Sequence, residues 1–186
     1  LAAASLEQVR LQWQGLGYYA RARRLHEAAQ LLAGRPWPHT IDPWLALPGI
    51  GRTTAGGILS SAFNAPVPIL DGNVKRVLAR LQAHPSPPAR DQALFWSWST
   101  ALLDPSRARD VNQALMDLGA TLCTPRNPSC DPCPWRCACA AYAAGDPSRW
   151  PMTDHRKPLP FQVIGIGVVF NAAGEVLIDQ RLEEGL

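Results

Sequence analysis

The sequence has no apolar run that approaches the ~20 residues needed to span a bilayer, and its first residues lack the charged and apolar regions of a signal peptide. These absences exclude a membrane-spanning helix and a visible export signal. Lysine is also scarce, because 16 of the 18 basic residues are arginines. Arginine suits the recognition of phosphate, although the same bias can reflect a GC-rich genome.

A length of 186 residues allows one ordinary domain or two small ones. With 47% hydrophobic and 18% charged residues, the chain does not have the composition of a disordered tail. Residues 1–160 hold 17 Lys and Arg against 11 Asp and Glu, whereas residues 161–186 hold 1 against 4. The basic part is compatible with a polyanionic partner, but this excess alone is a weak signal. The chain begins with Leu1 and not with Met, which indicates a piece of a longer protein.

Cysteine is absent outside residues 123–139, and all five cysteines lie within that segment. A disulfide framework would connect distant segments and use an even number of cysteines. A cluster this tight, in a chain without an export signal, is typical of a metal or iron–sulfur site in a reducing compartment. The protein is therefore expected in the cytoplasm.

Four of the cysteines have the spacing C-x6-C-x2-C-x5-C, namely Cys123, Cys130, Cys133 and Cys139. Four thiolates suit a [4Fe–4S] cluster, whereas zinc usually takes two C-x2-C pairs separated by a longer stretch. The fifth cysteine, Cys137, is interpreted as a neighbouring free thiol. The alternative is that Cys137 replaces Cys139 as the fourth ligand.

Residues 1–123 are predicted to be mostly helical. Ser5 and Gln8 form a capping-box pattern at the start of the first helix. Further helices are predicted over about 20–33, 42–47, from residue 51 to about 63, from 71–73 onward, over 91–103 and over 109–122. Residues 145–160 hold one glycine, four prolines and five charges, a composition typical of a linker.

Beyond residue 160 the pattern changes from helical to β-like. Residues 161–170 are rich in branched side chains, 171–175 have turn composition, and 176–178 form a second predicted strand. Two strands cannot fold alone. Residues 161–186 are therefore predicted to be the start of a β domain that is cut off at Leu186.

The sequence LPGIGRTTA at residues 47–55 has the helix–hairpin–helix pattern. Gly49 and Gly51 allow a tight turn and a close approach to a ligand. The free backbone N–H groups of the hairpin and of the next helix then face a phosphate. The predicted contact residues are Gly49, Ile50, Gly51, Arg52 and Thr53. The alternative is a plain Pro-Gly turn between two packed helices.

The sequence ILDGNVKRV at residues 69–77 places Asp71 where a loop becomes a helix. The commonest role of aspartate at such a position is to cap the helix. A helix N-terminus also stabilises an ionised carboxylate. An ionised carboxylate is what a cationic sugar transition state needs nearby, so Asp71 is also a candidate catalytic residue.

In combination, these motifs resemble the adenine DNA glycosylases of the MutY type, which belong to the helix–hairpin–helix superfamily with endonuclease III. The resemblance also includes WQGLGYYARAR at residues 13–23, ILDGNVKRVLAR at 69–80 and NQALMDLGA at 112–120. It implies a mainly α fold of two helical lobes with a [4Fe–4S] cluster and with DNA across the cleft. The implied parts are a hairpin lobe at 1–66, a cluster lobe at 67–144, a linker at 145–160 and a truncated Nudix-like β domain at 161–186.

The resemblance also implies roles for individual residues. Asp71 would stabilise the oxocarbenium-like sugar, and Asn73 would orient polar groups beside it or cap the helix. Tyr18 would enter the DNA stack beside the lesion, with core packing at a glycine turn as its alternative. The general acid of the family is a Glu on a helix that precedes these segments. Because neither Glu7 nor Glu27 matches it, this chain alone is expected to be inactive.

The implied partner is double-stranded DNA with an adenine mispaired with 8-oxoguanine or guanine. The protein is expected to act as a monomer in the bacterial nucleoid, without a membrane. One alternative is a bifunctional glycosylase/lyase that resembles endonuclease III, and another is a DNA-binding iron–sulfur module without catalysis. Endonuclease III-like sequences carry a lysine one residue after the hairpin arginine, where this chain has Thr53. A hydroxyl cannot form an imine, which favours a monofunctional glycosylase.

Overall fold

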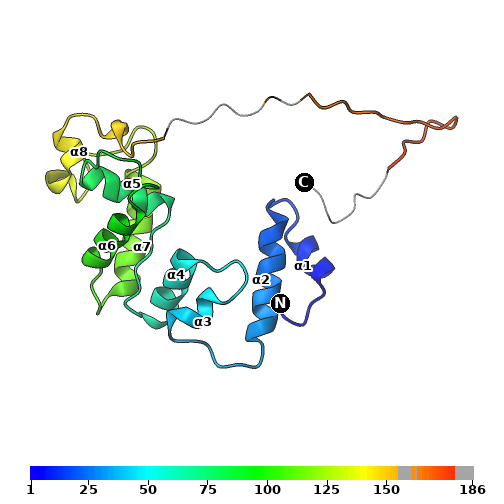
Figure 1. Cartoon of the computed structure of the whole chain (residues 1–186), viewed down its shortest axis with the longest axis horizontal. Helices are drawn as coiled ribbons and strands as arrows, with labels where there is room; N and C mark the ends of the chain where they lie inside the picture. Colours follow the sequence, from blue (N-terminus) through cyan, green and yellow to red (C-terminus); the bar gives the residue numbers. More distant parts are fainter. Residues whose placement is uncertain (155–160, 162, 179–186) are drawn as a thin grey trace. The chain divides into compact units, whose positions relative to one another are not determined.

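A computed structural model describes residues 1–154, 161 and 163–178 of the chain (Figure 1). The contacts between residues divide the chain into one unit at 1–154 and a second unit at 155–186. The described part of the first unit is built from helices joined by loops, as the mainly α prediction requires. None of the described helices is both long and apolar enough to cross a membrane.

The helices of the first unit follow the predicted order. The α-helices are α1 (Leu6–Gln12), α2 (Tyr19–Leu32), α3 (Ile41–Leu45), α4 (Arg52–Phe63), α5 (Gly72–Leu81), α6 (Gln92–Leu102), α7 (Ala108–Asp117) and α8 (Ala140–Ala143). Single turns of other helix types occur at Leu118–Leu122, Arg136–Ala138 and Pro147–Arg149. At the first helix, the predicted capping box is present, because the side chain and backbone of Ser5 each bond with Gln8.

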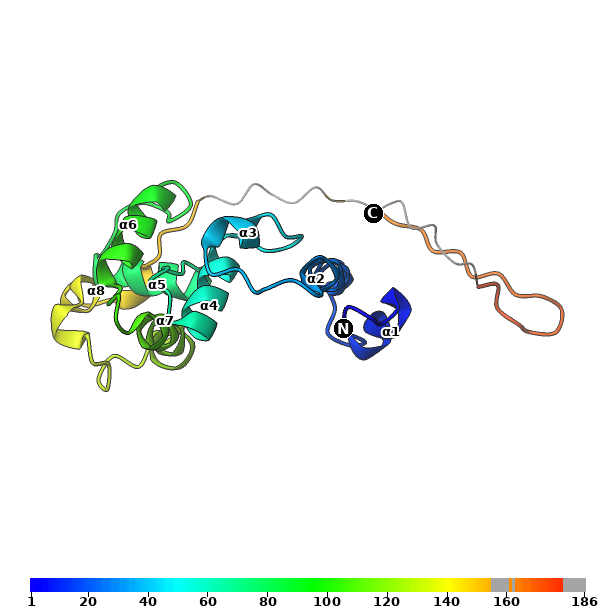
Figure 2. The same ribbon diagram turned by 90° about the horizontal axis from the view of Figure 1, so that it is seen from below.

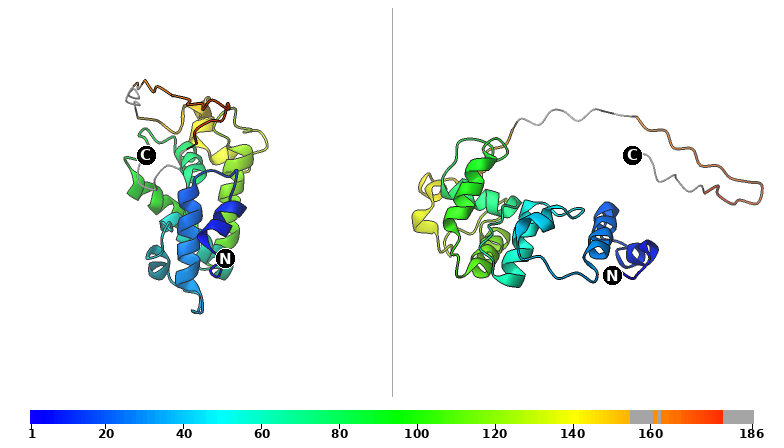
Figure 3. Two further views of the ribbon diagram at one scale, coloured as in Figure 1. Left: turned by 90° about the vertical axis from the view of Figure 1, so that its right-hand side faces the viewer. Right: turned by 60° about the horizontal axis from the view of Figure 1, so that its bottom comes forward.

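The helices pack through contacts between neighbours in the chain and through contacts between distant segments. Helix α1 lies beside α2, which all views show (Figure 3). Helix α3 pairs with α4, and α5 contacts α6, α7 and α8 (Figure 2). Helix α4 also packs against α7. The helix that follows the hairpin therefore contacts the helix that precedes the cysteines.

Two hydrophobic cores hold this arrangement. One surrounds Trp44, Ala55 and Leu59 at the hairpin. The other is centred on α5, where Val74, Val77, Leu78 and their neighbours are almost fully buried. Full burial of each such aliphatic side chain stabilises the fold by about 1.5–3 kcal/mol. Helix α5 therefore sits at the centre of the larger core, and the residues at its N-terminus are held firmly.

The first part of the linker expected at 145–160 belongs to the folded helical unit. Trp150 is 8% exposed, and its carbonyl oxygen accepts a hydrogen bond from the buried Arg80. The first unit continues to Asp154, so the first part of the expected linker packs against the helices. Residues 155–160 lie outside the described part of the chain.

In the second unit, the described residues form a turn between two extended segments. Phe170 and Val176 make one antiparallel bridge around the predicted turn, and Gly174 in that turn has φ +81°. The predicted strands at 161–170 and 176–178 are reduced to this bridge, since no strand occurs in the residues described. A pair of segments without a third strand or a helix against one face has little apolar surface to bury.

Candidate functional site

The hairpin joins α3 to α4 through a glycine turn. Gly49 has φ +75°, a value that glycine adopts without strain. A Cβ atom on Gly49 would also lie 2.9 Å from the Cβ of Arg24 in α2, so this glycine allows α2 to approach the hairpin. Gly51 caps α4 in an extended conformation, and α4 has no side-chain cap. The first N–H groups of α4 are therefore available to an anion.

The first residues of α4 connect the hairpin to the neighbouring core. The guanidinium carbon of Arg52 lies 3.9 Å from the ring centroid of Trp96 in α6, a cation–π contact. The Thr53 hydroxyl donates to the carbonyl oxygen of Leu70 at 3.1 Å. Leu70 directly precedes Asp71, so the structure brings the hairpin and the candidate catalytic carboxylate together. Ile50 is half-buried and packs against the hairpin core.

Asp71 is the N-cap residue of α5 and is half-buried. Its Oδ1 atom accepts a hydrogen bond of 2.7 Å from the backbone N–H of Val74. The predicted cap is thus present. A carboxylate has two oxygens and can accept several hydrogen bonds, so capping does not exclude an electrostatic role. The cap fixes the orientation of the carboxyl group.

Asn73 does not cap α5. It connects this helix to the cysteine segment, residues 123–139, through Arg76. Its Oδ1 accepts from Nη2 of Arg76 at 2.8 Å. Arg76 also donates to the carbonyl oxygens of Gly119, at 2.6 Å, and Cys123, at 2.7 Å. Burial lowers the pKa of Arg76, and the nearby Cys123 thiolate opposes that effect. The N-terminal end of α5 is therefore tied to the start of the cysteine segment.

The turn at Leu118–Leu122 is a π-helix that continues α7. A Cβ on Gly119 would lie 2.7 Å from the Cβ of Asn73, so the turn and α5 approach closely. The sequence predicts a helix over 109–122 but does not reveal the wider turn at its end. Such π turns are frequent at functional sites.

Four cysteines gather around one small pocket. The side chains that line it include Cys123, Cys130, Cys133 and Cys139, and they do not include Cys137, which is exposed. Burial raises the pKa of Cys130, and the negative charges of the other three thiolates raise it further. The four cysteines are neighbours because they line the same pocket.

The four pocket cysteines have the number and type of donors that a [4Fe–4S] cluster takes. Among the described residues, no three His, Cys, Asp or Glu side chains converge closely enough to hold one metal ion. A [4Fe–4S] cluster is larger and takes one thiolate on each of its irons. Four cysteines spaced around a pocket match that requirement, and the exposed position of Cys137 favours Cys139 as the fourth ligand.

Tyr18 stands at the turn between α1 and α2. It has φ +48° and ψ +50°, an unusual conformation for a residue other than glycine, and its side chain is 81% exposed. Gly15 and Gly17 also have positive φ, and the Trp13 indole donates to the Gly17 carbonyl at 2.8 Å. Core packing of Tyr18 is therefore wrong. The turn presents an aromatic ring to solvent.

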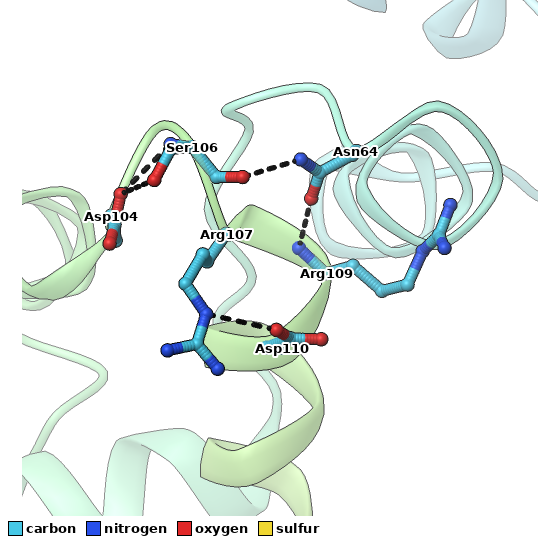
Figure 4. Close-up of polar contacts among 6 residues, drawn as sticks. All are labelled: Asn64, Asp104, Ser106, Arg107, Arg109 and Asp110. Carbon is cyan, nitrogen blue, oxygen red and sulfur yellow. Dashed lines mark hydrogen bonds and ion pairs between the residues drawn. The ribbon is translucent and has the colours of Figure 1, made fainter.

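A polar network ties the end of α4 to the start of α7 (Figure 4). The Asn64 side chain donates to the Ser106 carbonyl at 2.8 Å and accepts from the Arg109 backbone N–H at 3.0 Å. Asp104 accepts from both the backbone and the hydroxyl of Ser106. These bonds fix the end of α4 against the start of α7.

Comparison with known proteins assigns the chain to a family. The sequence model of the HhH-GPD superfamily of base excision DNA repair proteins matches residues 1–99, and the chain belongs to this superfamily. Within it, the chain is 47% identical over 148 residues to the adenine DNA glycosylase of Mus musculus, covering 76% of this chain and 29% of the mouse protein. An adenine DNA glycosylase of Buchnera aphidicola, from the Acyrthosiphon pisum subspecies, is 34% identical over 166 residues, with coverage of 86% and 47%. The chain thus spans less than half the length of these relatives.

Solved structures share the fold. A thermostable thymine-DNA glycosylase superposes with a TM-score of 0.69 at 27% identity, covering 77% of this chain and 68% of that one. Endonuclease III in a non-covalent complex with DNA has a TM-score of 0.62 at 23% identity, over the same shares of the two chains. The helical part therefore has the fold of this glycosylase superfamily.

Proposed function

We propose that the chain is part of an adenine DNA glycosylase that hydrolyses the N-glycosidic bond of adenine mispaired with 8-oxoguanine or guanine. The observation that carries this proposal is the hydrogen bond between Thr53 and Leu70, which joins a phosphate-binding hairpin to the carboxylate of the next residue. The similarity to adenine DNA glycosylases over most of the chain supports the choice of adenine.

The hairpin binds the DNA backbone in this proposal. Gly49, Ile50, Gly51, Arg52 and Thr53 surround the open N-terminus of α4, whose N–H groups attract phosphate. The excess of arginine in residues 1–160 has the sign that DNA requires. Because this contact is with the backbone, it holds DNA of any sequence and leaves recognition of the mispair to other residues.

In this proposal, Tyr18 is the side chain that inserts into the base stack beside the lesion. Flipping a base out of the duplex leaves a gap in the stack, and inserted side chains compensate for part of that cost. An exposed aromatic ring on a turn that is fixed by Trp13 and flanked by two glycines suits this role.

Asp71 supplies the negative charge that the reaction needs. Adenine leaves as a protonated base, and we assign that proton to a general acid outside this chain. Departure of the base leaves an oxocarbenium-like sugar, which the Asp71 carboxylate stabilises electrostatically. Asn73 accepts a hydrogen bond from Arg76, and this bond helps to fix the N-terminal end of the helix that presents Asp71. Water completes the reaction, because Thr53 offers no amine.

The four cysteines that line the pocket hold a [4Fe–4S] cluster. When bound, the cluster supplies a rigid cross-link that orders the loop from Cys123 to Cys139. No step of base removal passes through it. A reducing cytoplasm keeps these thiols available, which agrees with an enzyme that works on DNA inside the cell.

The test is base excision by the whole protein on two oligonucleotide duplexes. One holds adenine opposite 8-oxoguanine, and the other holds an oxidised pyrimidine. Excision of adenine alone is the expected result. Excision of the damaged pyrimidine with strand cleavage would favour the lyase alternative, and tight DNA binding without excision from either duplex would favour a non-catalytic module.

A further inference from the structure

Arg80 is the most deeply buried charged side chain among the residues described. It lies on α5 one turn beyond Arg76, and only 1% of it is exposed. No described carboxylate forms an ion pair with it. Burial of an unpaired charge is costly unless hydrogen bonds compensate. The partners of Arg80 must therefore explain why the fold retains a guanidinium at this position.

The partners of Arg80 lie at both ends of the cysteine segment. Its Nη1 donates to the Thr124 carbonyl at 2.7 Å, and its Nη2 donates to the Pro125 carbonyl at 3.2 Å. Its Nε donates to the carbonyl of Trp150 at 2.9 Å, beyond the last cysteine. One planar side chain thus fixes the beginning of the cysteine segment to the chain that follows it.

Arg80 also contacts two of the four pocket cysteines. Nη1 donates to the sulfur of Cys123 at 3.3 Å. The backbone carbonyl of Arg80 lies 3.5 Å from the sulfur of Cys139. A hydrogen bond from a cation to sulfur stabilises a thiolate, and the charge of the guanidinium offsets the negative charge of a four-thiolate cluster.

We propose that Arg80 is a positioning residue for the iron–sulfur cluster, which it retains and whose reduction potential it raises. This inference rests on the cluster of the proposed function. The carbonyl bonds hold Cys123 and the end of the segment at their places around the pocket. The N–H···S bond and the buried positive charge favour the reduced cluster, which carries more negative charge, so they raise the potential.

The experiment compares three iron-loaded proteins, namely the wild type, Arg80→Lys and Arg136→Lys. Arg136 lines the same pocket, but it is partly exposed and pairs with Asp131, which makes it the matched control. Lysine keeps the charge at position 80 but cannot reach all four acceptors. The measurements are iron release to a chelator and the reduction potential by protein-film voltammetry.

Arg80→Lys is expected to release iron about 10- to 100-fold faster than wild type, the range typical of lost outer-shell bonds to metal ligands. Its potential is expected to fall below that of wild type. Arg136→Lys should match wild type in both measurements. Equal iron release and equal potential in Arg80→Lys would overturn the role of Arg80 while leaving the cluster intact. A wild type without iron would overturn the proposed cluster, and the role of Arg80 with it.

A measurement without any change at position 80 covers the case in which Arg80→Lys fails to fold. Arginine labelled with 15N in its guanidino group is incorporated into a protein with Arg76→Lys and Arg136→Lys, which removes the other two guanidinium groups near the pocket. Pulsed EPR of the paramagnetic cluster should then detect coupling to nitrogen through the N–H···S bond. Absence of that coupling would overturn the proposal, because a purely structural arginine would give none.

Discussion

At the scale of single residues, the proposed function gives Asp71 a second task beside its helix cap, and the two tasks use different properties of one carboxyl group. Capping of α5 requires an oxygen that accepts from Val74, whereas stabilisation of a cationic sugar requires the negative charge. An amide has the same shape and can still cap the helix, but it has no charge. The two tasks can therefore be separated by one substitution.

Asp71→Asn in the whole protein should lower adenine excision by about 10²- to 10³-fold, the typical loss of one preorganised electrostatic group. Binding to the mispaired duplex should persist. Single-turnover excision and a binding titration measure the two quantities. Asp146→Asn is the control, since Asp146 also caps a helical turn but lies far along the sequence from the hairpin. Excision near the wild-type rate in Asp71→Asn would leave Asp71 as a cap only.

In the proposed function, the residue at position 53 distinguishes hydrolysis from lyase chemistry. Its side chain already bonds to the residue before Asp71, so an amine placed there would lie beside the sugar that Asp71 faces. Thr53→Lys should therefore form a covalent adduct with DNA under borohydride, and the wild type should not. Thr54→Lys is the matched control, because the next position on a helix points about 100° away. A strong adduct in the wild type would contradict a monofunctional enzyme.

The sequence predicts residues whose role depends on local pattern. Asp71 is predicted from its position at the start of a helix. The four cysteines are predicted from their spacing. The buried arginines Arg76 and Arg80 are not predicted, because arginine is usually exposed. Their acceptors are mostly backbone carbonyls more than forty positions away, as the bonds to Cys123 and Trp150 illustrate. The apolar residues around them on α5 indicate only that this face is buried.

At the scale of elements, the proposed phosphate contact of the hairpin uses the backbone N–H groups at the start of α4. Gly51 directly precedes these groups, and a Cβ at this position would have nothing within 4 Å. Its backbone is extended, with φ −92°, so other residues fit there without strain. An acidic substitution at Gly51 therefore changes the charge of the surface and leaves the fold unaltered.

Gly51→Asp should weaken binding to matched and mismatched DNA alike, by roughly 5- to 10-fold, because a carboxylate beside a phosphate adds about 1 kcal/mol of repulsion. The measurement is a binding titration at several salt concentrations, and affinity should fall with salt for both proteins. Gly51→Ala adds the same Cβ without the charge and should bind like wild type. Unchanged affinity in the folded Gly51→Asp protein would refute the phosphate-binding role of the hairpin.

The π turn after α7 depends on a glycine for a different reason. A Cβ on Gly119 would lie 2.7 Å from the Cβ of Asn73, inside the distance that real Cβ contacts allow. Gly119→Ala should therefore lower the free energy of unfolding by about 1–3 kcal/mol, as overpacking does. Gly57→Ala, where nothing lies within 4 Å, should raise it by about 0.5–1 kcal/mol. Denaturant unfolding measures both values, and equal stability of the two variants would contradict the close approach.

The helices were predictable because their ends carry local signals, such as the capping box at Ser5 and the apolar positions of α5. The π turn was not, because its extra residue per turn leaves no mark in the spacing of apolar side chains. The predicted strands near Phe170 and Val176 formed only one bridge. Strand formation depends on partners elsewhere in a sheet, which the described residues of the second unit do not provide.

At the scale of the whole molecule, the cysteine segment closes the larger core. Its residue Trp135 packs against that core, and Arg76 and Arg80 bond to its start. A cluster that orders the cysteine segment would therefore also stabilise α5 and the residues at its N-terminus. The division of the helical unit into lobes at 1–66 and 67–144 remains a prediction, although the two cores lie on either side of that boundary.

Loss of a pocket cysteine should have effects beyond the pocket. Cys139→Ser should reduce iron content and lower the melting temperature, because one ligand of the cluster is lost. Cys137→Ser is the control and should keep both, since Cys137 is exposed and does not line the pocket. Elemental analysis, visible absorption and thermal unfolding measure these effects. Loss of iron in Cys137→Ser but not in Cys139→Ser would show that Cys137, and not Cys139, is the fourth ligand.

The hydrogen bond from Thr53 to Leu70 has a consequence for how such an enzyme searches DNA. In the proposed function, it keeps a constant offset between the hairpin that binds a phosphate and the Asp71 carboxylate that faces a sugar. Whichever nucleotide the hairpin holds, the sugar at that offset is the one inspected. Each step along the duplex then presents a new candidate in the same register, and the protein needs no fresh alignment before it attempts to flip a base.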